Sequence, residues 1–278
     1  MTSTARPVVE ELASSKSKSV AAAAYLTDRL WVRIVLPVLV LVLILAAWEG
    51  LSAVGVLNPI TVPSPSAIAL SFTELVTRQY FWEATSVTLS ATLLGFAIGT
   101  SSGLILGALT GTFKTFRVAI MPFIVAFQNT PRIALAPIFL TWFGFGLTSK
   151  VVMAAVICFF PVVINMVAGI AAVGEGEKTL FRSLGATKGQ TFFRLTLPGA
   201  SPIAFAGVKT ALTLALLGAI VAEFVGASEG LGVLIKELNF QLLVAHGFAV
   251  VVFLSAIGLL LYGLIELAEK KLITWSRD

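Results

Sequence analysis

Long apolar runs separated by short polar segments dominate this chain. A membrane-spanning helix needs about 20 mostly apolar residues, and six runs approach or exceed that length. They cover approximately residues 34–54, 87–111, 117–142, 150–173, 201–225 and 244–267. The third run contains Pro122, Pro131 and Pro137, so we expect its helix to be broken. The pattern predicts an all-α membrane protein with about six transmembrane helices.

The segments before and after the first run are polar. Residues 1–30 are rich in Ser and Ala and lack the apolar core and cleavage site of a secretory signal. We expect a tail there, ending in a short interfacial helix from Val20 to Leu30. In the connection over residues 58–86, Ser64 or Ser66 is expected to cap a short helix at about residues 66–76. Residues 31–278 are expected to form one transmembrane domain.

Composition and charge placement agree with a membrane protein. The 278 residues are 58% hydrophobic and only 12% charged, whereas soluble domains are about a quarter charged. The net charge of +5 does not indicate nucleic-acid binding, because the basic residues sit between the apolar runs. Fourteen of the 19 Lys and Arg residues fall in the N-terminal tail, the 112–117 loop, the 174–198 segment and the C-terminus. This asymmetry predicts that both termini are cytoplasmic.

Metal, cofactor and catalytic chemistry find no support in the sequence. The single cysteine, Cys158, lies in an apolar run and is expected to be a small buried hydrophobe. The single histidine, His246, is expected to lie at the membrane interface. No phosphate-binding Gly-x-x-x-x-Gly-Lys-Ser/Thr motif occurs, and no hydrolase or metalloprotease motif. We expect no metal, no cofactor and no enzymatic activity of the chain itself.

Glycines recur every four residues in the second apolar run. Because four residues turn a helix by about 400°, they form one stripe along the helix. Small residues at this spacing allow two helix backbones to approach closely, so we assign these glycines to helix packing. They are Gly95, Gly99, Gly103, Gly107 and Gly111.

The segment over residues 174–198 is too polar to cross the membrane and carries four basic residues. Leu180, Phe181 and Leu184 share one helical face, and Gly185 then permits a sharp turn. An amphipathic helix of this kind can dock a partner protein or lie on the lipid surface. The residues alone leave both alternatives open.

This segment resembles the EAA loop of ABC importer permeases. Gly185 is followed by nine residues to Arg194 and then by Leu195-Thr196-Leu197-Pro198, which is the spacing of that loop. Thr179-Leu180-Phe181 replaces the Glu-Ala-Ala that names it. Over residues 50–270 the chain is similar to the nitrate/sulfonate/taurine-type subfamily, in motifs such as 62–65, 131–137, 142–144, 183–186 and 222–224.

The resemblance implies a type I importer permease with the MetI-like fold, in a bacterial cytoplasmic membrane. It implies partners: separate cytoplasmic ATPases, an external solute-binding protein and a second permease copy, usually identical, within the lipid bilayer. A small polar or anionic solute would enter the cytoplasm. The residues that would couple the chain to the ATPase are Leu180, Phe181, Arg182, Leu184, Gly185, Ala186, Leu197 and Pro198.

Two ionisable residues lie within apolar runs, where charge is costly and usually faces a bundle interior or a cavity. Arg132 lies three residues after Asn129 in the proline-broken third run. We expect it either to attract an anionic solute or to play a structural role by contacting a carbonyl or an acid. Glu223, near the outer end of the fifth run, pairs with Arg132, belongs to a gate or is structural. We favour the structural alternatives and keep Asn129, Arg132 and Glu223 as candidate pathway residues.

An ion-coupled secondary transporter is the main alternative function. Such transporters use intramembrane acids and often contain internal repeats, whereas this chain offers Glu49, Glu223 and no clear repeat. A membrane enzyme or scaffold has no positive feature in its favour.

Overall fold

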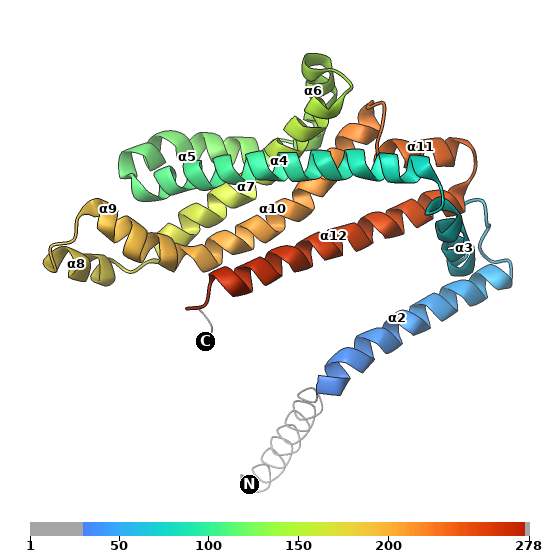
Figure 1. Ribbon diagram of the computed structural model, residues 1–278, viewed down its shortest axis with the longest axis horizontal. Coiled ribbons are helices and arrows are strands. Elements are labelled where there is room, and N and C mark those ends of the chain that lie inside the picture. Colours follow the sequence, from blue (N-terminus) through green and yellow to red (C-terminus); the bar gives the residue numbers. More distant parts are fainter. Residues whose placement is uncertain (1–29, 276–278) are drawn as a thin grey trace, which may run out of the picture. The chain divides into compact units, whose positions relative to one another are not determined.

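A computed structural model describes residues 30–275 of the chain, with side chains from residue 35 onward. All regular elements in this range are helices (Figure 1), which confirms the predicted all-α class. The expected interfacial helix from Val20 to Leu30 lies outside the described range, apart from its last residue. The chain divides into two compact units, Met1–Ala67 and Ile68–Asp278, which are described separately.

The first unit consists of helix α2 (Leu30–Ala53) and the first residues of α3 (Pro65–Leu75). The large apolar side chains of α2 from Val35 to Leu45 are all exposed, as expected of a helix surrounded by lipid. Ser64 accepts a hydrogen bond from the Ala67 amide, so it is the cap of α3. The carboxylate of Glu49 accepts two more bonds, from the amide and the hydroxyl of Ser66, at 3.0 and 2.7 Å.

The second unit contains the remaining helices in chain order. They are α4 (Gln79–Thr112), α5 (Lys114–Asn129), the 3₁₀ helix η1 (Arg132–Leu135), α6 (Ala136–Phe143), α7 (Leu147–Ala172), α8 (Glu175–Ser183), α9 (Lys188–Thr191), the π-helix η2 (Phe192–Thr196), α10 (Leu197–Val225), α11 (Leu231–Phe240) and α12 (Val244–Leu272). Helix α4 begins eight residues before the apolar run that predicted it. Helix α11 was not predicted from the sequence.

Helix α7 lies at the centre of this unit and packs mainly against α4 and α10. Each glycine of the α4 stripe faces a residue of α7, in the order Ala154, Cys158, Val162, Met166 and Ile170. A Cβ atom added at Gly99 would lie 2.4 Å from Cys158 Sγ and 2.5 Å from the Ala155 carbonyl oxygen. The glycine stripe therefore provides close contact between two helix backbones.

Small residues of α10 complete the core on the other side of α7. Ala211, Ala215 and Ala219 are buried in one cluster with Ala154 and Cys158 of α7. Cys158 is fully buried there, and its Sγ lies 3.6 Å from the Gly95 carbonyl oxygen. Helices α4, α7 and α10 thus approach one another closely because most residues between them are small.

Within the described residues, five helices are long and apolar enough to cross a membrane. A sixth span is obtained if α5 and the segment η1–α6 count as one, although they meet at 87°. Only one of the three prolines of this run breaks it, since Pro122 lies inside α5 and Pro137 in the first turn of α6. Pro131 requires an extended residue before it, and Thr130 accordingly has φ −72° and ψ 137°.

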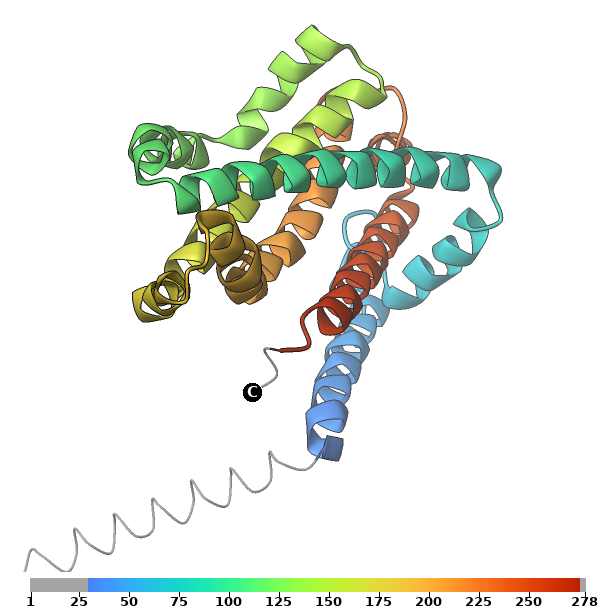
Figure 2. The same cartoon turned by 60° about the vertical axis from the view of Figure 1, so that its left-hand side comes forward.

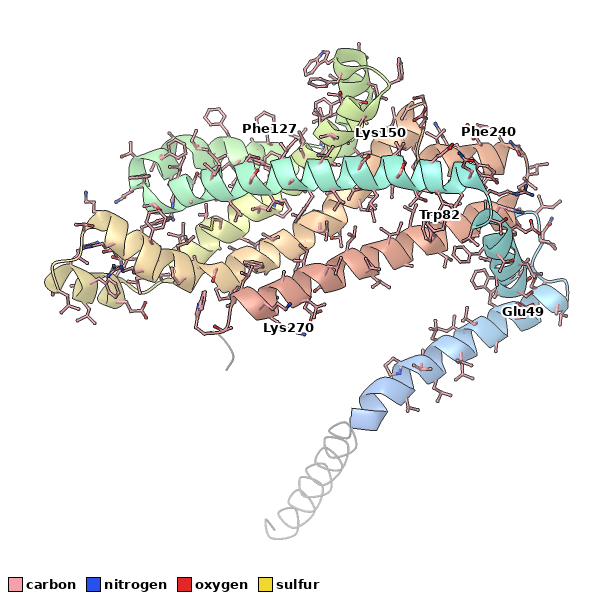
Figure 3. The ribbon with its side chains drawn as sticks, viewed as in Figure 1. Glu49, Trp82, Phe127, Lys150, Phe240 and Lys270 are labelled. Carbon is pink, nitrogen blue, oxygen red and sulfur yellow. The ribbon has the colours of Figure 1, made fainter. Side chains whose placement is uncertain are left out.

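The two ends of the second unit carry different structures. Figures 1 and 2 show α8 and α9 at one end and α11 at the other. Figure 3 places Lys150 and Phe240 toward the α11 end and Lys270 at the far end of α12. Near the α11 end, His246 Nε2 lies 3.1 Å from the Glu74 carboxylate.

Candidate functional site

The polar segment between α7 and α10 forms a short helix with a defined end. Helix α8 has Glu175 and Glu177 in its first turn and Arg182 in its last, which suits the helix dipole. The ammonium group of Lys178 lies 2.9 Å from Glu175 and lowers the pKa of that carboxyl.

Gly185 ends α8 in a Schellman motif. Its amide donates to the Arg182 carbonyl, and the Ala186 amide donates to the Phe181 carbonyl, both at 3.0 Å. This motif needs a left-handed residue, and Gly185 has φ +77°. The turn expected at Gly185 from the sequence is therefore present, with a specific geometry that few other residues adopt.

The chain then re-enters a helix without a break. Thr187 and Gln190 form a capping box in which each side chain bonds the other residue's amide. From Lys188 the helix continues through α9, η2 and α10 to Val225, a single candidate span of 38 residues. The turn at Gly185 is thus joined by continuous helix to α10, which packs on α7 and α4.

Most of the predicted coupling residues gather at this turn. Leu180 and Leu184 are 58% and 76% exposed although they are apolar, Phe181 and Ala186 are half-buried, and Arg182 and Gly185 are exposed. Leu197 and Pro198 do not join them. They start α10, where the Pro198 carbonyl accepts a bond from the Trp275 indole at 3.2 Å.

Arg132 satisfies a carbonyl group that a proline leaves free. Pro161 lies inside α7 and has no N–H to donate to the Ile157 carbonyl four residues earlier. An Nη atom of Arg132 donates to that oxygen at 3.1 Å, and its guanidinium lies 5.3 Å from the centre of the Phe160 ring. Asn129, the last residue of α5, is exposed. The contacts of Arg132 tie the bend between α5 and α6 to α7.

Glu223 is fully buried and caps α11, the next helix in the chain, which begins eight residues later at Leu231. Its two carboxylate oxygens accept bonds from the Thr88 hydroxyl at 2.8 Å and from the Gly232 amide at 2.7 Å. The same hydroxyl accepts a bond from the Leu231 amide at 2.8 Å. The first two amides of α11 are thus satisfied, and carboxylate charge is favourable at a helix N-terminus. Arg132 and Glu223 each have these partners of their own and do not pair with each other.

A buried lysine holds the loop that precedes α11. Lys150 is 1% exposed, and its ammonium donates to the Glu229 carbonyl. The Ser228 amide donates to the Phe145 carbonyl at 3.4 Å, so the loop is also joined to the turn between α6 and α7. Neither Lys150, the first residue of the fourth apolar run, nor Thr88 was predicted as a functional residue from the sequence. Apart from the position of Lys150 in an apolar run, no sequence signal marks either residue.

Comparison with known proteins decides the family. The sequence pattern of the "Binding-protein-dependent transport system inner membrane component" family matches residues 99–274. The chain belongs to this family. It is therefore an ABC importer permease, and the predicted importer resemblance is confirmed.

Relatives of this permease are similar over nearly their whole length. A formylaminopyrimidine transport permease protein, ThiX, from Halalkalibacterium halodurans is 34% identical, with 87% of this chain and 96% of the relative covered. A riboflavin transport system permease protein, RibX, from Chloroflexus aurantiacus is 36% identical, with 88% and 91% covered. A taurine transport system permease protein, TauC, from Escherichia coli is 25% identical, with 86% and 88% covered.

Solved structures share the fold of the permease. An amino acid ABC transporter aligns with a TM-score of 0.56 at 21% identity, covering 73% of this chain and 97% of the other. The MetNI methionine ABC transporter aligns with a TM-score of 0.53 at 20% identity, with the same coverage. The predicted MetI-like fold is confirmed, and membership of this family replaces the alternative of an ion-coupled secondary transporter.

Proposed function

We propose that this permease carries a small polar or anionic solute into the cytoplasm, driven by a separate ABC ATPase that docks on the turn around Gly185. The observation that carries this proposal is the pair Leu180 and Leu184, two exposed leucines on a helix too polar to enter the membrane. Exposed apolar residues on a fixed turn fit a groove in a partner protein. The uninterrupted helix from Lys188 to Val225 would convert ATP-driven closure into movement of α10.

The charge distribution supports the orientation that this function requires. Basic residues concentrate at both termini and in the 112–117 and 174–198 segments, which favours a cytoplasmic location for all four. The α11 end would then face outward, where a solute-binding protein delivers the solute. The resemblance to the subfamily supports a working unit of two identical permeases and two ATPases. Hydrolysis would belong to the ATPase, since this chain lacks a phosphate-binding motif.

The relatives do not favour one solute. The names of three of them specify a formylaminopyrimidine, riboflavin and taurine, which share little chemistry. We propose that the exposed amide of Asn129 faces the pathway, at the bend after α5. Arg132 and Glu223 would shape that pathway through the helices that they fix, since their polar groups already have protein partners.

Co-purification with a co-expressed candidate ABC ATPase tests the coupling proposal. The test variant is Leu180→Asp with Leu184→Asp, and the matched control is Thr179→Asp with Ser183→Asp on the same helix. Both add two negative charges to exposed positions of α8. We expect the control to retain the ATPase and the leucine variant to lose it. Equal capture by both variants, or no ATPase with the wild type, would refute the docking surface.

A further inference from the structure

A cavity of about 870 Å³ lies between the end of α4 and the segment α8–η2. Its walls are formed by Leu109 of α4, Phe113 just after α4, Ile170 of α7 and Phe192 of η2. Its rim includes Lys178, Arg182 and Lys188. Two candidate spans, α4 and α7, end beside it, so the cavity lies at the level where a membrane meets water. It is apolar on the membrane side and basic on the aqueous side.

Helix α8 presents different residues to this cavity and to the proposed ATPase. Lys178 and Arg182 line the cavity, whereas Leu180 and Leu184 do not. Since each residue turns an α-helix by about 100°, the two pairs lie on roughly opposite faces of α8. The cavity therefore excludes the two leucines on which the coupling proposal rests, although Arg182 and Ala186 of the predicted coupling set do line it.

Two of the three rim cations form no direct ion pair in the described part of the chain. Lys178 pairs with Glu175 at 2.9 Å, but no ion pair engages Arg182 or Lys188 within residues 35–275. Glu175 is the one acidic residue on the cavity wall. The rim thus has an excess of positive charge that an external anion can neutralise.

The apolar wall continues along the outside of α4. Leu94, Ile98, Ile105 and Leu109 are all exposed, and at about 100° per residue they fall within a stripe about 60° wide. Ser101 and Ser102, beside this stripe, donate their hydroxyl protons to the Ala97 and Ile98 carbonyls. The stripe leads from the middle of α4 to the cavity, which Ile105 and Leu109 also line, and offers an apolar surface along which an acyl chain can lie.

We propose that this cavity binds one anionic phospholipid, with its phosphate on Arg182 and Lys188 and an acyl chain along the α4 stripe. Basic pockets between transmembrane helices at the cytoplasmic face are suited to anionic headgroups. A soluble phosphate is a poorer fit, because it would bind the rim and leave the apolar wall exposed to water. The ATPase does not need this cavity, because the leucine face of α8 is available to it. The lipid would brace the coupling helix against the membrane. This proposal rests on the cytoplasmic orientation proposed above.

Native mass spectrometry of the purified full chain tests the proposal. It compares the binding of anionic phosphatidylglycerol with that of phosphatidylcholine, which is zwitterionic and has no net charge. The variant is Arg182→Gln with Lys188→Gln. The control is Lys114→Gln with Lys271→Gln, which removes the same charge from exposed residues at the same end of the unit that do not line the cavity. We expect one tightly bound phosphatidylglycerol on the wild type and the control, and roughly thirtyfold weaker binding to the variant.

Several results would overturn the site. These are equal binding of the two lipids, unchanged phosphatidylglycerol binding by the variant, or the same loss in the control. Displacement of the lipid by millimolar inorganic phosphate would show an anion site without an acyl groove. Loss of ATPase capture by the variant with lipid binding unchanged would assign the rim to the ATPase. The lipid titration uses the permease alone, so failure of the coupling proposal does not affect its outcome.

Discussion

The hydroxyl of Thr88 donates a 2.8 Å hydrogen bond to the carboxylate of Glu223, across 135 positions of the chain. Because the same hydroxyl accepts the Leu231 amide, one side chain of α4 links α10 to the start of α11. Both side chains are at most 1% exposed, so water cannot replace the bond. This pair fixes α11 to the core of the unit.

Replacing Thr88 by Val leaves both the carboxylate and the Leu231 amide short of a partner. We expect the free energy of unfolding to fall by about 1–3 kcal/mol, the cost of an unsatisfied buried polar group. Thermal unfolding of the purified protein in detergent measures the change. Thr85→Val is the control, because the Thr85 hydroxyl bonds only the Phe81 carbonyl of its own helix. Equal effects of the two substitutions would contradict the role of Thr88.

The contact of Arg132 with the Ile157 carbonyl predicts a dependence on Pro161. Arg132→Met should lower the free energy of unfolding by about 1.5–3 kcal/mol, the range for a hydrogen bond to a charged group. In a Pro161→Ala background the restored N–H serves the same carbonyl, so Arg132→Met should cost about 1 kcal/mol or less, the part due to Phe160. A double-mutant cycle on thermal unfolding measures this coupling.

An additive cycle would show that Arg132 does not serve the Ile157 carbonyl. If Arg132→Met assembles with undiminished stability and loses uptake of an anionic solute, Arg132 belongs to the translocation pathway. Uptake into proteoliposomes that contain the complete transporter distinguishes the two cases.

Two glycine-to-alanine substitutions should affect the free energy of unfolding differently, one lowering it and the other leaving it unchanged or raising it. At Gly99 the new methyl group collides with the Ala155 backbone and Cys158, so we expect a loss of about 1–3 kcal/mol from overpacking. Gly263 of α12 has open space around it, and Ala there should be neutral or stabilising by up to about 1 kcal/mol, because Ala favours helix. Melting temperatures compare the two variants. A stable Gly99→Ala protein would contradict the close contact of α4 and α7.

The left-handed backbone at Gly185 predicts a graded series of substitutions. Asn tolerates this conformation, whereas a β-branched residue rarely adopts it. Gly185→Asn should therefore retain ATPase capture and solute uptake, and Gly185→Val should lose both while the permease still folds. Gly176→Val, at an open position in α8, is the control. Uptake by Gly185→Val at the wild-type rate would show that this turn is not needed for coupling.

The sequence predicted the features that depend on neighbouring residues. Apolar runs located the spans, a local motif left Ser64 or Ser66 as the cap of α3, of which the structure has Ser64, and Gly185 marked the turn after α8. Each of these signals lies within one helix or one turn. The family resemblance added the fold, which the solved structures confirm.

Features that depend on distant contacts could not be predicted. Three prolines lie in the third run, and only Pro131 bends it. Pro137 stands in the first turn of α6, where its missing N–H would have had no partner, and Pro122 lies inside α5. Thr88 bonds Glu223 directly although 135 positions separate them, and Lys150 bonds the loop between α10 and α11. A single sequence does not say which polar residues of different spans lie side by side.

The placement of the coupling turn and the α11 loop at opposite ends of the unit (Figure 1) has a consequence for divergence among relatives. Under the proposed function, mutations that change which solute enters can accumulate near the α11 end without altering the turn proposed to contact the ATPase. Selection would then retain one energy-coupling surface while the solute changes. Relatives named for a pyrimidine derivative, a flavin and a sulfonate, all alignable with this chain over most of its length, are the expected result.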